Sequence, residues 1–113
     1  MPFIVVNTNA DVKVSEDMLN DFSNLAVEVL GKQKNYISVM INTKQKMLFG
    51  DSLQNIGALI EFKSIGFGDK RPILAEKLKN LAVNYFDAQG LFVGIEFVDM
   101  SAQNVSHDGK LMG

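Results

Sequence analysis

The chain has 113 residues, the size of one domain, and its 47% apolar and 21% charged residues are ordinary for a globular protein. Its formal net charge of −2 argues against a protein built mainly to bind nucleic acid. The absence of cysteine excludes disulfides, thiolate nucleophiles and cysteine metal sites. A single histidine rules out a multi-histidine metal cluster within one chain.

The N-terminus lacks the features of a signal peptide. It has no basic region, and its apolar run from Phe3 to Val6 is far too short. No apolar stretch approaches the length of a membrane span. We therefore expect a cytoplasmic protein without a membrane partner, and export without a leader is left open.

The first half of the chain predicts a strand, a helix and a second strand. Residues 2–9 (PFIVVNTN) contain a continuous apolar run, which indicates a strand covered on both faces. Ser15 is a favourable N-cap for a helix that ends at Gly31. Residues 35–43 (NYISVMINT) alternate as a strand does. The helix carries an apolar stripe of Met18, Leu19, Phe22, Leu25, Ala26, Val29 and Leu30.

The second half predicts the same order after a loop at residues 44–55, which has room for a minor strand around residues 47–49. Residues 58–66 (ALIEFKSIG) and 91–98 (LFVGIEFV) are strand candidates. Pro72 suits the first turn of a helix that ends before the turn-like residues 87–90, and the polar residues 101–113 are expected to be mostly irregular. The predicted stripe of this helix is Ile73, Leu74, Leu78, Leu81, Ala82 and Tyr85.

The two halves match at an offset of roughly 55 to 58 residues, which indicates a duplicated βαβ unit. The repeats span about residues 2–50 and 57–105 of a single domain, residues 1–113. The predicted fold class is α/β (α+β): a four-stranded mixed sheet with both helices on one face. Because one face stays uncovered, we expect a homo-oligomer; the alternative is a monomer whose tail folds over the sheet.

Pro2 follows the initiator methionine directly and precedes the first strand. One interpretation is structural, because proline is tolerated as the first residue of a strand. The other is chemical: once Met1 is removed, Pro2 becomes a free secondary amine that can act as a base. If Met1 stays, the proline nitrogen is an amide and cannot.

Several stretches together resemble the macrophage migration inhibitory factor family of the tautomerase superfamily. They are MPFIVVNTN, the GK after the first helix, YISVMI, MLFG, SIG and DMSAQNV, in this order over essentially the whole chain. The resemblance implies a homotrimer whose sheets form a central barrel, with active sites between subunits. It implies keto–enol tautomerisation of aryl pyruvates such as phenylpyruvate, and isomerisation of dopachrome derivatives. The N-terminal proline would be the base, without cofactor or metal.

The chemistry of such a reaction explains why an amine at this position suits it. A proton on the carbon next to a carbonyl is removed by a base that is neutral near pH 7. Burial and a nearby lysine both lower the pKa of an amine and so favour its neutral form.

The resemblance assigns further residues to the site. Lys32 matches the lysine that binds the substrate carboxylate, although a lysine just past a helix end also complements the helix dipole. Ser64 and Ile65 match the stretch whose backbone approaches the substrate, and the Ile65 N–H is the expected donor. Tyr36 is either a substrate-stacking ring or a half-buried residue at a strand start. The family-matched pocket walls are Phe3, Tyr36, Ile65, Val105 and Met112.

The fourth strand departs from the family pattern. Gly94 and Glu96 stand where well-known members carry a tyrosine and an asparagine, both contributed by the neighbouring subunit. Glu96 near the amine would raise the pKa of the base and repel a carboxylate. Phe97 is an aromatic that could rebuild the wall, although strand alternation aims it away from Glu96. His107 stands where the family often has an aromatic near the entrance, or is a solvated residue of the tail.

A second departure concerns a pair of cysteines that some members carry in the third strand, where Gly57 and Ile60 stand here. Thiol redox chemistry is therefore excluded.

Three functions compete at this point. The first is a cofactor-independent tautomerase, with Pro2 as base and Lys32 as anchor. The second is a cytokine-like protein that acts on a receptor while its pocket is a relic. The third is a hydratase or dehalogenase of small unsaturated acids, which ranks last because Arg71 is the only arginine.

Overall fold

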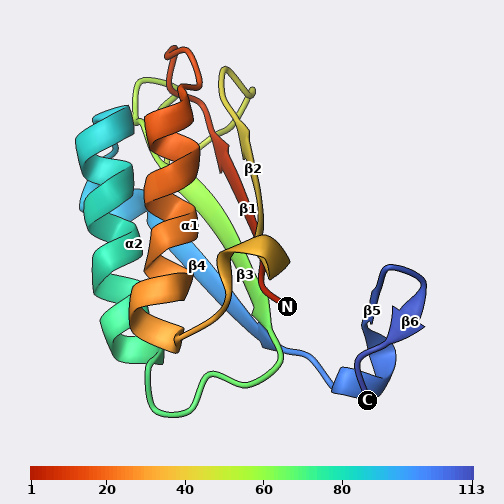
Figure 1. Ribbon diagram of the computed structural model, residues 1–113. Helices are drawn as coiled ribbons and strands as arrows, with labels where there is room; N and C mark the ends of the chain where they lie inside the picture. Colours follow the sequence, from red (N-terminus) through yellow and green to blue (C-terminus); the bar gives the residue numbers. More distant parts are fainter.

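Two helices cover one face of a four-stranded sheet in the computed structural model, which describes residues 1–113 (Figure 1). A small C-terminal hairpin follows the last strand of the sheet. The strands are β1 (Phe3–Thr8), β2 (Ser38–Asn42), β3 (Ala58–Ser64), β4 (Val93–Asp99), β5 (Ser106–His107) and β6 (Lys110–Leu111). The α-helices are α1 (Glu16–Leu30) and α2 (Arg71–Phe86), and the 3-10 helices are η1 (Lys34–Tyr36), η2 (Gly90–Phe92) and η3 (Ala102–Asn104).

The sheet is mixed, with the strand order β2-β1-β3-β4. Strands β1 and β2 are parallel, as are β3 and β4, while β1 and β3 pair antiparallel at the centre. The halves share one order of elements: strand, α-helix, 3-10 helix, strand. The predicted four-stranded mixed sheet with both helices on one face is therefore confirmed.

The two faces of the sheet differ in burial. In β1, Ile4, Val6 and Thr8 are fully buried beneath the helices, while the residues between them are only half-buried. On the opposite face, Met40 keeps 56% and Leu59 51% of its surface exposed. The prediction that the first strand is covered on both faces is thus wrong for the single chain. The tail does not supply such cover, because the β5–β6 hairpin lies beyond the end of β4 and not over the sheet (Figure 1).

Helix α1 begins and ends where the sequence signals predict. The Ser15 hydroxyl accepts a hydrogen bond from the Met18 N–H at 3.2 Å. At the other end Gly31 adopts a left-handed φ of +67°, which glycine reaches without steric cost. The Gly31 N–H then donates to the Val27 carbonyl and the Lys32 N–H to the Ala26 carbonyl. This turn directs the chain out of the helix at Lys32.

Helix α2 contains Pro72 in its first turn, as predicted, but its buried stripe differs from the expected one. Ile73 is 44% exposed, because it precedes buried Leu74 by one residue and so lies about 100° around the helix axis. The sequence analysis missed Phe86, which closes the stripe and stacks on Phe22 of α1 with ring centroids 6.5 Å apart. The buried residues are Leu74, Leu78, Ala82 and Phe86, and Leu81 and Tyr85 pack partly buried against them.

Two connecting segments also differ from expectation. The tail is not mostly irregular: Asp108 and Gly109, with φ of +53° and +76°, form a tight turn between β5 and β6. Positive φ at both central residues matches the twist of a two-residue hairpin. The loop at residues 44–55 contains no strand, only an isolated bridge between Phe49 and Ser52.

Candidate active site

The N-terminal segment enters the sheet at Pro2, which is among the most deeply buried side chains of the chain. Its carbonyl accepts a hydrogen bond from the Ser38 N–H at 3.1 Å, which ties the start of β1 to β2. Burial, and after it the Lys32 ammonium, lowers the pKa of the terminal amine, which in this structure belongs to Met1. The Lys32 ammonium is therefore close enough to the start of β1 to act on the charge of the terminal amine.

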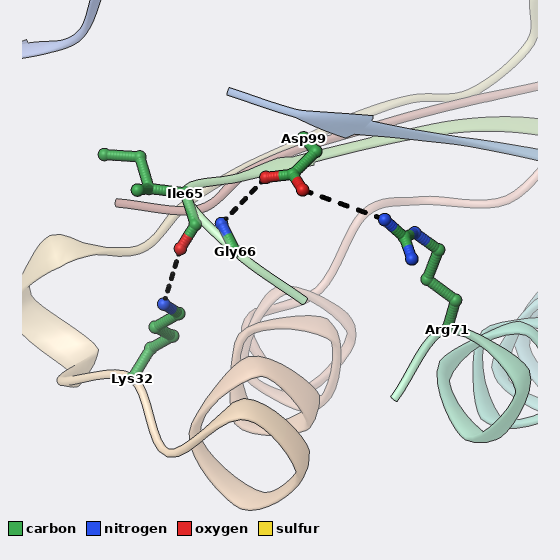
Figure 2. A network of polar contacts seen from close by, with 5 residues as sticks. All are labelled: Lys32, Ile65, Gly66, Arg71 and Asp99. Atoms are coloured by element: carbon green, nitrogen blue, oxygen red, sulfur yellow. Dashed lines mark hydrogen bonds and ion pairs between the residues drawn. The ribbon is translucent and has the colours of Figure 1, made fainter. Parts of the chain in front are cut away.

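Lys32 reaches the end of β3. Its half-buried side chain leaves the left-handed turn at Gly31, and its Nζ donates a hydrogen bond to the Ile65 carbonyl at 3.0 Å (Figure 2). An ammonium has three N–H donors, so this bond leaves two for a ligand. The structure thus brings the predicted residues Lys32 and Ile65 together.

The same peptide unit that receives Lys32 is held on its other side by a carboxylate. The Gly66 N–H donates to Asp99 Oδ1 at 3.0 Å, and Asp99 Oδ2 lies 3.8 Å from an Arg71 guanidinium nitrogen (Figure 2). The Arg71 guanidinium lies 5.2 Å from the centroid of the Phe67 ring. Sequence reasoning gave Asp99 no role and Arg71 no place near the site. No local signal could have found this network, because it joins the start of α2 to the end of β4.

The Ser64 side chain does not face the site. It is fully buried on the helix-facing side of β3, and its hydroxyl is the one buried side-chain polar atom without a hydrogen-bond partner. Its carbonyl accepts from the Met100 N–H at 2.8 Å. Only the backbone of Ser64 is thus available for the role that sequence analysis assigned to this stretch.

Glu96 and Phe97 point to opposite faces of β4. Glu96 is exposed on the open face, where the register sets it beside Glu61. Phe97 lies on the helix side, with its ring centroid 6.1 Å from that of Phe62 and 5.4 Å from that of Phe67. Phe97 thus packs partly buried against the core on the face opposite to Glu96, as strand alternation predicts, and its part in an aromatic wall stays a prediction.

The tail brings His107 to Tyr36. The two rings meet edge to face with their centroids 4.7 Å apart, and Tyr36 is half-buried. Val105 is buried, and its carbonyl accepts a hydrogen bond from the N–H of the exposed Met112 at 2.8 Å. Tyr36 thus ends η1, while Val105 and Met112 flank the two strands of the C-terminal hairpin.

The surface of the single chain has three depressions, and Pro2, Lys32 and Ile65 line none of them. The smallest, of about 260 Å³, begins at Phe3 and continues between β1 and β2. A second, of about 390 Å³, lies over Gly94 and Glu96 on the open face of the sheet. No group of histidine and acidic side chains is arranged to hold a metal ion, and no helix is long and apolar enough to cross a membrane.

Comparison with known proteins decides the family. A family model described as macrophage migration inhibitory factor (MIF) matches residues 1–113. The chain belongs to the MIF family. It is 34% identical over 116 residues to a macrophage migration inhibitory factor homolog of Brugia malayi, with both chains covered completely. It is 32% identical to the Trichuris trichiura homolog over 113 residues, which cover 97% of this chain and 98% of the relative.

A solved MIF structure supports the same assignment at the level of the fold. The macrophage migration inhibitory factor of Trichinella spiralis superposes with a TM-score of 0.84 at 29% identity, covering 96% of this chain and 98% of the other. Within this MIF fold, the start of β1, the turn after α1 and the end of β3 lie together, and these three segments carry Pro2, Lys32 and Ile65.

Proposed function

We propose that the chain is a cofactor-independent keto–enol tautomerase of aryl pyruvates such as phenylpyruvate, with isomerisation of dopachrome derivatives as a related activity. The general base is the Pro2 amine, freed by removal of Met1. The observation that carries this proposal is geometric: Pro2 is buried at the start of β1, and Lys32, held at the Ile65 carbonyl at 3.0 Å, lies close enough to lower the pKa of the Met1 amine that precedes Pro2. Membership of the MIF family supports an isomerase of this kind.

Each residue has a defined task in the proposed reaction. The neutral Pro2 nitrogen takes a proton from the carbon next to the substrate carbonyl, and the electron pair of the broken C–H bond forms the C=C bond of the enol. The protonated Pro2 amine gives a proton, directly or through water, to the carbonyl oxygen, which becomes the enol hydroxyl, and the amine is neutral again. Lys32 pairs with the substrate carboxylate, and the Ile65 N–H donates a hydrogen bond to the substrate. Together these contacts hold the reacting carbon beside the amine.

We further propose that a homotrimer completes the site. The open face of the sheet exposes Met40 and Leu59, and β2 and β4 are uncovered sheet edges. Pro2 lines no depression of the single chain, so a neighbouring subunit would supply the missing wall. Phe3, Tyr36, Val105 and Met112 are the proposed apolar walls, and Glu96 is the proposed contribution of β4 from the neighbour.

The test compares the mature protein with its Pro2→Gly variant in an ultraviolet assay of phenylpyruvate tautomerisation, after mass spectrometry has confirmed that Met1 is absent. We expect kcat to fall by about a hundredfold, because the base is no longer a secondary amine held in place by the proline ring. Glycine keeps a free amine but makes it primary and less constrained. Equal rates in both proteins would overturn the proposal and favour the receptor-binding alternative, in which the substitutions Gly94 and Glu96 have disabled the site.

A further inference from the structure

We propose that Asp99 is the positioning residue for Lys32, acting through the peptide unit between Ile65 and Gly66. This inference rests on the proposed function, because it assigns to Lys32 the task of binding a carboxylate substrate. It concerns a residue at the end of β4 that need not touch the substrate itself.

The first step is that two charged side chains hold opposite ends of one peptide unit. The Ile65 carbonyl and the Gly66 N–H belong to the same planar group and point in opposite directions. Lys32 binds the carbonyl at 3.0 Å and Asp99 accepts from the N–H at 3.0 Å (Figure 2). Asp99 therefore fixes the direction in which the carbonyl points, and that carbonyl fixes the ammonium.

The second step is that this peptide unit needs to be held. Gly66 has a φ of +83°, and nothing lies within 4 Å of the place where its Cβ would be. Glycine populates positive and negative φ about equally, so Gly66 itself does not hold this peptide in one orientation. A flip would turn the Ile65 carbonyl away from Lys32 and the Gly66 N–H away from Asp99.

The third step is that Asp99 is itself anchored. Its backbone ends β4 opposite Ser64, where the register and the Met100 N–H bond to the Ser64 carbonyl hold the two strand ends together. Arg71 lies 3.8 Å from its second oxygen, at the first residue of α2. The Gly66 N–H thus has a carboxylate acceptor whose backbone is held at the end of β4, while Gly66 itself adds no side-chain restraint.

The consequence concerns substrate affinity. Without Asp99 the Ile65 carbonyl loses its direction, and the Lys32 side chain has to be ordered by the substrate. Asp99→Ala should therefore raise the KM for phenylpyruvate about tenfold while kcat falls less than about threefold. Asp99→Asn keeps an oxygen acceptor for the Gly66 N–H, so its KM should stay within about twofold of the wild-type value.

A matched control and a double-mutant cycle separate this role from a general effect of charge. The control is Asp69, a carboxylate in the connection between Gly66 and α2 whose side chain is almost fully exposed. Asp69→Ala should leave KM unchanged. In a Lys32→Met background, Asp99→Ala should cause no further change, because the two residues act as one unit. An equal rise in KM in both backgrounds, or an Asp99→Asn variant as impaired as Asp99→Ala, would overturn the proposal.

Two further measurements keep the test independent of turnover and of variant stability. If wild-type protein proves inactive, the proposed function fails, and the same cycle is run on the Kd of phenylpyruvate measured by calorimetry. Hydrogen exchange of the Gly66 amide in wild-type protein needs no variant. Exchange at least about tenfold slower than the free-peptide rate is expected from its bond to Asp99, and a freely exchanging amide would overturn the inference.

Discussion

The imidazole of His107 meets the ring of Tyr36 edge to face, with centroids 4.7 Å apart, and so links the C-terminal hairpin to η1. An edge-to-face aromatic pair contributes about 0.5–1.5 kcal/mol. His107→Ala should therefore loosen the hairpin, seen as faster hydrogen exchange in β5 and β6. His107→Phe retains an aromatic ring and should behave like wild type. Unchanged exchange in His107→Ala would show that the contact does not hold the hairpin.

Gly57 lies where the chain leaves no room for a side chain. A Cβ there would clash with the Phe92 carbonyl oxygen and lie 2.8 Å from the Phe92 Cβ. Gly57→Ala should lower the free energy of unfolding by about 1–3 kcal/mol, measured by urea denaturation. Gly90→Ala is the control, because its Cβ would meet only the Lys79 side chain at 3.6 Å. Equal stability of the two variants would contradict this prediction.

Ser64 and Thr8 are both fully buried hydroxyl residues, but only one of them is partnered. The Thr8 hydroxyl donates to the Gly57 carbonyl at 2.6 Å and accepts from the Ala10 N–H at 3.2 Å, whereas the Ser64 hydroxyl has no partner. Thr8→Val should cost about 1–3 kcal/mol of unfolding free energy, because it leaves buried groups unpaired. Ser64→Ala should change that free energy by less than about 1 kcal/mol. Urea denaturation of both variants tests the contrast.

Tyr85 joins the two helices through a hydrogen bond from its hydroxyl to Asp21. That bond, with burial and the charges of Asp21 and Asp17 adding to it, raises the Tyr85 pKa from 10.0 to about 12. The interaction therefore stabilises the fold fully below pH 10 and is lost as pH rises through about 12.

A spectroscopic titration checks this pKa directly. The chain has two tyrosines, so the Tyr36→Phe variant leaves Tyr85 as the only phenol whose ionisation is seen in the ultraviolet. Asp21→Asn in that background should lower the Tyr85 pKa toward its ordinary value. A midpoint that stays the same with Asp21→Asn would mean that another group causes the shift.

Lys32 should also set the pH dependence of the proposed reaction. Its ammonium lowers the pKa of the Met1 amine and should act in the same direction on the Pro2 amine once Met1 is removed, and only the neutral amine can accept a proton. Lys32→Met should therefore move the acidic limb of the kcat/KM profile to higher pH, in addition to raising KM. Burial is the larger cause of the lowered pKa, so the shift should be partial. The pH profile of kcat/KM for phenylpyruvate measures it.

Local signals in the sequence predicted those features that depend on few neighbouring residues. Ser15 and Gly31 bound α1 because a hydroxyl cap and a left-handed glycine act within one helical turn. The face of Phe97 followed from strand alternation alone. The β5–β6 hairpin was missed because its strands have two residues each, too few to show alternation, although its Asp-Gly turn is a hairpin signal.

Features that depend on tertiary contacts could not be predicted in this way. Asp99 lies far from Gly66 and Arg71 in the sequence, and only the folded sheet and the start of α2 bring it to them. The lowered pKa of the terminal amine depends first on burial and then on the Lys32 charge, and both are set by tertiary packing. Ile73 was misplaced because Ile73 and Leu74 are both apolar, and the sequence does not show which of them faces the sheet.

The register that sets Glu61 beside Glu96 limits how the open face of the sheet can be covered. Two like charges on adjacent strands repel, and Lys63, at 3.9 Å from Glu61 on the same strand, balances only part of that charge. Any chain that covers this face must therefore either leave water at these carboxylates or bring a positive group to them. The β3–β4 side of the open face therefore favours a hydrated or charge-paired interface over a dry one.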